Sequence, residues 1–149
     1  ITFIGNKENW LKPMISEFDL ENEIKLVGFL PKDELGKYYQ DSDLLLVTSA
    51  KRDAGKDSFI ASKTYEYLQQ GKMILGIVAD GAQKDFLNKS KAALVIDADR
   101  LKEDKYKLLD FARKEKIELQ YNMEYLKSFS IQETTNKLEK VFNSILKVH

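Results

Sequence analysis

Two charged residues three positions apart, Lys63 and Glu66, are the part of this sequence best suited to bind a phosphorylated ligand. The apolar pattern around them predicts a helix that begins near Ser62. A lysine ammonium can neutralise a phosphate, and the two oxygens of a carboxylate can accept hydrogen bonds from neighbouring ribose hydroxyls. A nucleoside diphosphate would satisfy both side chains. The same spacing also fits an ordinary ion pair on a solvated helix face.

The loop before this helix supports the same prediction. Residues 50–61 carry the basic side chains Lys51, Arg52 and Lys56 and lead directly into the helix. The first N–H groups of a helix have no intrahelical partners, and we expect the Ser62 side chain to cap one of them. A helix start of this kind attracts anions. A plain polar surface loop remains the alternative.

Composition excludes several classes of site. The 149 residues include no cysteine and one histidine, His149, so the chain cannot build thiolate metal sites, disulfides, Ser-His-Asp relays or multi-histidine metal sites. Asp53 and Asp57 flank a glycine too loosely to argue for a cation, and we expect neither a metal nor a cofactor. With 24 basic and 24 acidic residues, no net charge draws the chain toward nucleic acid.

Apolar runs alternate with amphipathic segments along the chain. The runs cover residues 1–5, 24–30, 43–49, 73–79 and 92–97. Their continuous apolar stretches predict strands buried on both faces, with helices between them and two longer helices at about 101–119 and 131–146. This order predicts an α/β fold, a Rossmann-like, doubly wound parallel sheet of about five strands with C-terminal helices. Ligands of such sheets bind beyond the carboxyl ends of the strands.

Two features refine this fold. The turn after the first strand, Gly5-Asn6, is followed by no glycine-rich fingerprint, which disfavours an NAD-type site. In the last helix, Ser130 and Glu133 stand in capping-box spacing, and an apolar face that includes Leu138 and Phe142 follows them. A final helix with an apolar face must cover another surface.

Three stretches together resemble a known domain. They read ITFIGNKENWLKPMISEFDLENEIKLVGFLPKDEL, YYQDSDLLLVTS and SKTYEYLQQGKMILGIV. Over nearly its whole length the sequence resembles the C-terminal, donor-binding domain of the retaining, sugar-nucleotide-dependent glycosyltransferases of group 1, which have the GT-B fold. The third stretch is the most specific, because it is similar to the family helix that bears a ribose-binding glutamate.

The resemblance implies roles for individual residues. Glu66 matches the ribose-binding glutamate, the helix start at residues 60–62 would present N–H groups to the donor diphosphate, and the turn at Phe29 and Leu30 would hold the base. Lys63 and the loop cations would stabilise charge on the leaving diphosphate. The predicted donor-binding residues are Glu66, Lys63, Ser62, Ala61, Ile60, Phe29, Leu30 and Arg52.

The sequence departs from the family at one catalytic position. Many members have another glutamate eight positions before the ribose-binding one, where it serves the donor sugar, and this chain has Ser58 there. Three interpretations stay open: Asp57 takes this role, the sugar is bound differently, or transfer is weakened. The predicted catalytic residues are Lys63, as the cation for the leaving diphosphate, and Ser58, as the residue at the glutamate position.

The function implied by the resemblance is transfer of a sugar from a nucleoside-diphosphate sugar to an acceptor hydroxyl, in synthesis of a cell-surface polysaccharide or glycolipid. Residues 1–149 would form one nucleotide-sugar-binding domain of a larger two-domain enzyme, inactive without its N-terminal acceptor domain. The alternatives are a sugar-nucleotide epimerase of the same fold and a non-catalytic nucleotide-binding or scaffold domain. We expect a cytoplasmic protein, with its lysine-rich C-terminal helices as a candidate contact with the inner face of the membrane.

Overall fold

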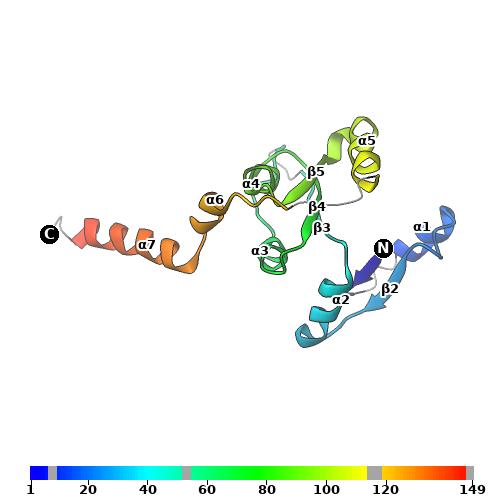
Figure 1. The fold of residues 1–149 in the computed structure, drawn as a ribbon, viewed down its shortest axis with the longest axis horizontal. Helices are drawn as coiled ribbons and strands as arrows, with labels where there is room; N and C mark the ends of the chain where they lie inside the picture. The colour runs from blue at the N-terminus through cyan, green and yellow to red at the C-terminus, as the bar shows by residue number, and fades with distance from the viewer. Residues whose placement is uncertain (7–9, 52–54, 114–118, 147–149) are drawn as a thin grey trace. The chain divides into compact units, whose positions relative to one another are not determined.

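The computed structural model describes residues 1–6, 10–51, 55–113 and 119–146. The chain divides into two compact units, residues 1–42 and 43–149, each of which is described by itself (Figure 1). Arg52, Asp53 and His149, which the sequence analysis singled out, lie outside the described residues.

The first unit is a strand-helix-strand unit followed by a short helix. Strands β1 (Thr2–Ile4) and β2 (Lys25–Gly28) pair in parallel, with α1 (Leu11–Glu17) between them in the chain. Pro13 lies in the first turn of α1, where its missing N–H group costs no intrahelical hydrogen bond. A 3₁₀ turn at Lys32–Glu34 then leads into α2 (Leu35–Asp41).

The second unit has a three-stranded parallel sheet. Its strands β3 (Leu44–Thr48), β4 (Met73–Val78) and β5 (Ala93–Asp97) lie in the order β3-β4-β5. Helix α3 (Ser62–Gln69) connects β3 to β4, and α4 (Ala82–Ser90) connects β4 to β5. The core beneath these helices is apolar, which makes its burial the main source of stability. It consists of Val47, Ile74, Val78, Phe86 and Leu87.

Helices complete the second unit. After a 3₁₀ turn at Ala98–Arg100 come α5 (Leu101–Ala112), α6 (Met123–Lys127) and α7 (Ile131–Leu146). Figure 1 shows α3 and α4 on one side of the sheet and α5 on the other, as in a doubly wound fold. Helix α7 begins as predicted, since the Ser130 hydroxyl accepts a hydrogen bond from the N–H of Glu133 at 3.2 Å. Among the described residues no helix is long and apolar enough to span a bilayer.

The predicted fold class is confirmed, with one difference in the sheet. All five predicted strands form and pair in parallel, but they make sheets of two and three strands instead of one. The break falls between β2 and β3. The boundary between the two compact units, at residues 42 and 43, falls in the same stretch of chain, so each sheet belongs to one unit. The prediction of one nucleotide-sugar-binding domain over residues 1–149 stays a prediction.

Gly81 is where the second unit tolerates no side chain. It has φ +141°, and a Cβ atom there would lie 1.9 Å from the carbonyl oxygen of Asp57. The backbones of Asp57 and Gly81 are held this close by two hydrogen bonds, from Asp57 N–H to the Asp80 oxygen (2.9 Å) and from Ala82 N–H to the Asp57 oxygen (2.7 Å). The loop after β3 is therefore clasped to the loop after β4.

We predict that Gly81→Ala lowers the free energy of unfolding by about 3 kcal/mol or more, because the clasp must open to admit the methyl group. Gly71→Ala is the matched control: it also has a positive φ, of +65°, but open space around it, and should cost only about 1 kcal/mol. Urea unfolding measures both losses. Equal losses would show that backbone conformation alone matters at Gly81.

Candidate functional site

A cavity of about 460 Å³ lies at the carboxyl ends of β3 and β4. Its wall comes from the residues that follow β3, from the residues just before α3 and from the first turn of α4. This is where a doubly wound sheet binds its ligand, and where the loop at residues 50–61 was predicted to bind one. The lining residues are Thr48, Ser49, Ala50, Lys51, Asp57, Phe59, Ile60, Ala61 and Gln83.

Asp57 shapes the cavity with its backbone and its side chain. Its main chain is clasped by Gly81, and the residue is only 4% exposed. One carboxylate oxygen accepts a hydrogen bond from Phe59 N–H at 3.2 Å, which holds the turn toward α3. Ser58, by contrast, is exposed and is not part of the cavity wall. Ser58 occupies the position of the family's glutamate and Asp57 is its neighbour, and of these two residues the structure brings Asp57 to the cavity.

The start of α3 differs from the prediction in its capping. The helix begins at Ser62 as expected, but Ser62 is its first helical residue and does not cap it. The start of α3 is instead held by a side chain of another helix: Gln83 Oε1 accepts hydrogen bonds from Ala61 N–H (2.7 Å) and from the Thr64 hydroxyl (3.1 Å). This tertiary contact fixes the residue that precedes the helix, and the N-cap is Ala61, so the prediction of Ser62 as the N-cap was wrong.

The predicted row of N–H groups is thus only partly available to a ligand. The Ala61 N–H group is engaged by Gln83. The N–H groups of Ile60 and Ser62 donate to no other residue of the described chain. Ile60 lies before the helix and Ser62 is its first residue, so neither N–H group has an intrahelical acceptor and both can serve an anion.

Gln83 is the site residue that the sequence analysis missed. It is 1% exposed, and its Nε2 is the buried side-chain nitrogen left without a partner within the described chain. An unpaired buried donor costs about 1–3 kcal/mol, so it needs an explanation. In sequence Gln83 is an ordinary polar residue in a polar helix turn. Only the pairing of α4 with the start of α3 reveals its position.

Lys63 and Glu66 lie on α3, outside the cavity wall, and both are half-buried. Burial lowers the pKa of Lys63 below its usual value of 10.5, and no neighbouring charge offsets this effect among the described residues. Lys63 is a partly desolvated cation one turn from the cavity, where it can attract an anion.

The loop cations differ in their availability. Lys51 lines the cavity, but its Nζ lies 2.8 Å from an Asp99 oxygen, and this contact raises the pKa of Lys51. Lys56 is exposed. The turn after β2 belongs to the first unit, where Phe29 is 78% exposed, and its contact with a base stays a prediction.

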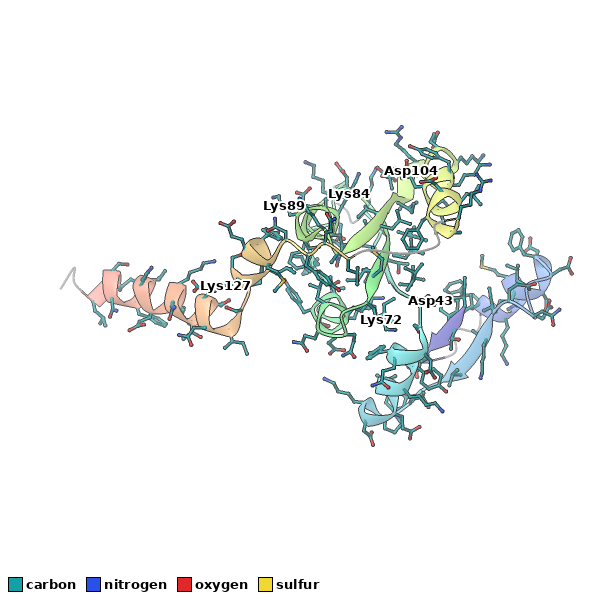
Figure 2. All side chains as sticks on the ribbon, in the orientation of Figure 1. Asp43, Lys72, Lys84, Lys89, Asp104 and Lys127 are labelled. Atoms are coloured by element: carbon teal, nitrogen blue, oxygen red, sulfur yellow. The ribbon has the colours of Figure 1, made fainter. Side chains whose placement is uncertain are left out.

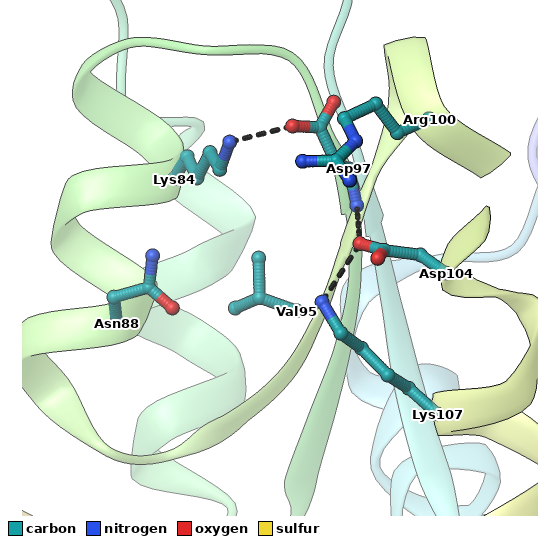
Figure 3. A pocket seen from close by; sticks show the side chains of 7 residues that line it. All are labelled: Lys84, Asn88, Val95, Asp97, Arg100, Asp104 and Lys107. Carbon is teal, nitrogen blue, oxygen red and sulfur yellow. Dashed lines mark hydrogen bonds and ion pairs between the residues drawn. The ribbon is translucent and has the colours of Figure 1, made fainter.

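A second, smaller cavity of about 190 Å³ between α4, β5 and α5 is lined by ion-paired side chains (Figure 3). Lys84 Nζ lies 2.7 Å from Asp97, and Lys107 Nζ lies 2.8 Å from Asp104. These contacts lower the pKa of both aspartates. Figure 2 places Lys84 and Asp104 at the same end of β5. The cluster joins the strand to its two helices.

The same cluster gives no metal centre. Asp104 Oδ2 also accepts the N–H of Asp97 at 3.0 Å, so its lone pairs are directed at protein donors. In the part of the chain that the structure describes, no group of three or more Asp, Glu or His side chains could hold a metal ion.

Comparison with known proteins identifies the family. The family described as "Glycosyl transferases group 1" matches residues 1–125. A 45-residue segment is 42% identical to the amylovoran biosynthesis glycosyltransferase AmsK of Erwinia amylovora; it covers 30% of this chain and 11% of AmsK. No solved structure matches the chain.

We predict that Lys63→Met stabilises the chain at pH 7 by about 1 kcal/mol, a typical gain for one stabilising substitution. The lowered pKa means that the unfolded chain holds the proton more tightly. The cost of the buried charge is thus fully present below the folded pKa and is relieved as the pH rises toward 10.5. The gain should shrink over that window in urea unfolding. Lys56→Met, at an exposed lysine, is the control, and a gain independent of pH would contradict this account.

Proposed function

Because the chain belongs to the group 1 glycosyltransferases, we propose that it binds the nucleoside-diphosphate sugar from which the enzyme transfers a sugar to an acceptor hydroxyl. The observation that carries this proposal is the cavity at the carboxyl ends of β3 and β4, which borders a helix start with unengaged N–H groups. Such donors suit a diphosphate.

The chemical demand of the reaction is negative charge on the leaving diphosphate. As the glycosidic bond breaks, this charge grows, and fixed dipoles stabilise it without reorganisation. The N–H groups of Ile60 and Ser62 supply such dipoles. A fixed donor in this role contributes about 3–4 kcal/mol to transition-state stabilisation. Lys63 adds a positive charge whose partial burial strengthens its attraction for an anion, because fewer water molecules compete for it.

The nucleoside would extend from the cavity along α3. Glu66 lies three positions after Lys63, and its carboxylate would accept hydrogen bonds from the two ribose hydroxyls. The base would contact Phe29 and Leu30, and Arg52 would serve as a further cation for the diphosphate. These contacts follow from the family resemblance.

Asp57 is the carboxylate that we assign to the donor sugar. It lines the cavity, while Ser58 at the family's glutamate position does not. Only one of its oxygens is committed to the Phe59 N–H group, according to the contacts within the described chain. This arrangement supports the interpretation that Asp57 takes over the role of the missing glutamate.

The chain would act as the donor-binding part of a two-domain GT-B enzyme in the cytoplasm, partnered by an acceptor-binding domain. We place this activity in the synthesis of a cell-surface polysaccharide or glycolipid, and the name of AmsK, which concerns amylovoran biosynthesis, supports a biosynthetic role of this kind. The transfer needs no metal in this proposal, because N–H groups and lysine neutralise the diphosphate. The lysine-rich helices after β5 would bring the enzyme to an anionic membrane surface.

Titration of the chain with uridine and guanosine diphosphates by calorimetry tests the site. We predict that one of them binds, and that Glu66→Ala weakens its binding about 10- to 100-fold, the usual effect of losing hydrogen bonds to a charged group. Binding of inorganic pyrophosphate, which has no ribose, should not change. Glu103→Ala, at an exposed position of α5, is the control. Equal weakening for both ligands would exclude the ribose role, and no binding by folded protein would exclude the site.

We also predict that Asp57→Asn in the full-length enzyme lowers the transfer rate about 100-fold or more, with little change in donor affinity. Asparagine keeps the oxygen that accepts the Phe59 N–H group, so the turn is preserved while the charge is lost. Asp43→Asn, at an exposed position, is the control. Ser58→Glu is the converse test: it should not raise the transfer rate above that of the unmodified enzyme if Asp57 already performs the role. A rate insensitive to Asp57→Asn but raised by Ser58→Glu would favour weakened transfer.

A further inference from the structure

The unpaired amide nitrogen of Gln83 lies in a side chain that cannot turn to find a partner. The Ala61 N–H group can only donate, so the atom 2.7 Å from it must be the oxygen of the carboxamide. The Thr64 hydroxyl donates to the same oxygen at 3.1 Å. A flip of the amide would bring two N–H groups face to face. Nε2 is therefore fixed in place, with no acceptor among the described residues.

Two backbone groups at the start of α3, close to Gln83 in the structure, are also donors without a partner in the described chain. Ile60 and Ser62 present N–H groups with no acceptor among the described residues. Together with Nε2 of Gln83 they form a set with hydrogen to give and no lone pair to offer. An oxygen-rich anion matches such a set. A sugar hydroxyl or a base edge, which presents donors as well as acceptors, matches it less well.

We propose that Gln83 binds the diphosphate of the donor. Its Nε2 donates a hydrogen bond to a phosphoryl oxygen, while its Oε1 holds the start of α3 in place. One side chain thus presets the helix start and completes the anion site. This inference rests on the proposed function and adds to it a specificity residue from α4. The structural half of the role is the hydrogen bond to Ala61, and the ligand-binding half is Nε2.

Gln83→Glu separates the two halves. The introduced carboxyl keeps an acceptor for Ala61 N–H and the Thr64 hydroxyl, but it replaces the donor with a negatively charged oxygen. We expect nucleoside-diphosphate affinity to fall about 10- to 100-fold. Inorganic pyrophosphate should lose affinity by a similar factor, unlike in Glu66→Ala. Gln70→Glu, which adds the same charge at the exposed end of α3, should change neither.

Acidification provides a second readout. A buried carboxyl is protonated more readily than an exposed one and then regains an O–H donor. Affinity of the Gln83→Glu chain should therefore recover toward that of the unmodified chain as the pH falls from 7 to about 5, with the unmodified chain measured at each pH as reference. Continued weakness at low pH in a folded variant would contradict the donor role.

The outcomes distinguish this inference from the function beneath it. If the unmodified chain binds no nucleoside diphosphate, both fail. If it binds and Gln83→Glu binds equally well, the role of Gln83 fails and the proposed function stands. Should Gln83→Glu not fold, nitrogen NMR of the unmodified chain decides: saturating diphosphate should shift the Gln83 side-chain N–H signals and slow their solvent exchange. Unchanged signals would overturn the proposal.

Discussion

The backbone clasp between Asp57 and Gly81 is the constraint on which the candidate site depends. Two hydrogen bonds, of 2.9 Å and 2.7 Å, tie the loop after β3 to the start of α4. They leave no room for a Cβ atom at Gly81. Without the clasp, Asp57 would not be held at the cavity, and the segment leading into α3 would lose its anchor. Main-chain bonds of this kind depend little on pH or salt, so the geometry is stable under varied conditions.

Given that geometry, the described residues attract an anion to the cavity through fixed dipoles more than through free cations. The cations at this edge of the sheet are largely neutralised by aspartates: Lys51 by Asp99, and Lys84 by Asp80 and Asp97. Among the described residues, the groups that remain to attract an anion are the N–H groups at the start of α3, the amide of Gln83, the partly desolvated Lys63 and the exposed Lys56. Dipoles held by the fold need no reorganisation when charge develops, which is the property that the proposed transfer from a nucleoside-diphosphate sugar would require.

Prediction from sequence succeeded where local pattern determines structure. The strands at residues 43–49 and 73–79 were recognisable from continuous apolar runs, and the helix start at Ser62 from the change of period. The hydrogen bond that holds the start of that helix was not recognisable, because its acceptor is Gln83, 22 residues away from Ala61. Two sheets of two and three strands were likewise not predicted, since strand pairing is a long-range choice that periodicity does not encode.

The sequence by itself determined the fold class, the family and the segment in which a diphosphate site should be sought. These depend on hydrophobic period, turn residues and short motifs, all of which are local properties of the chain. Only the tertiary structure decided which atoms make up the site. It brought Asp57 and not Ser58 to the cavity, engaged the N–H group of Ala61 and left Nε2 of Gln83 unpaired. The physical reason is that hydrogen bonding and burial are set by segments that meet only after folding.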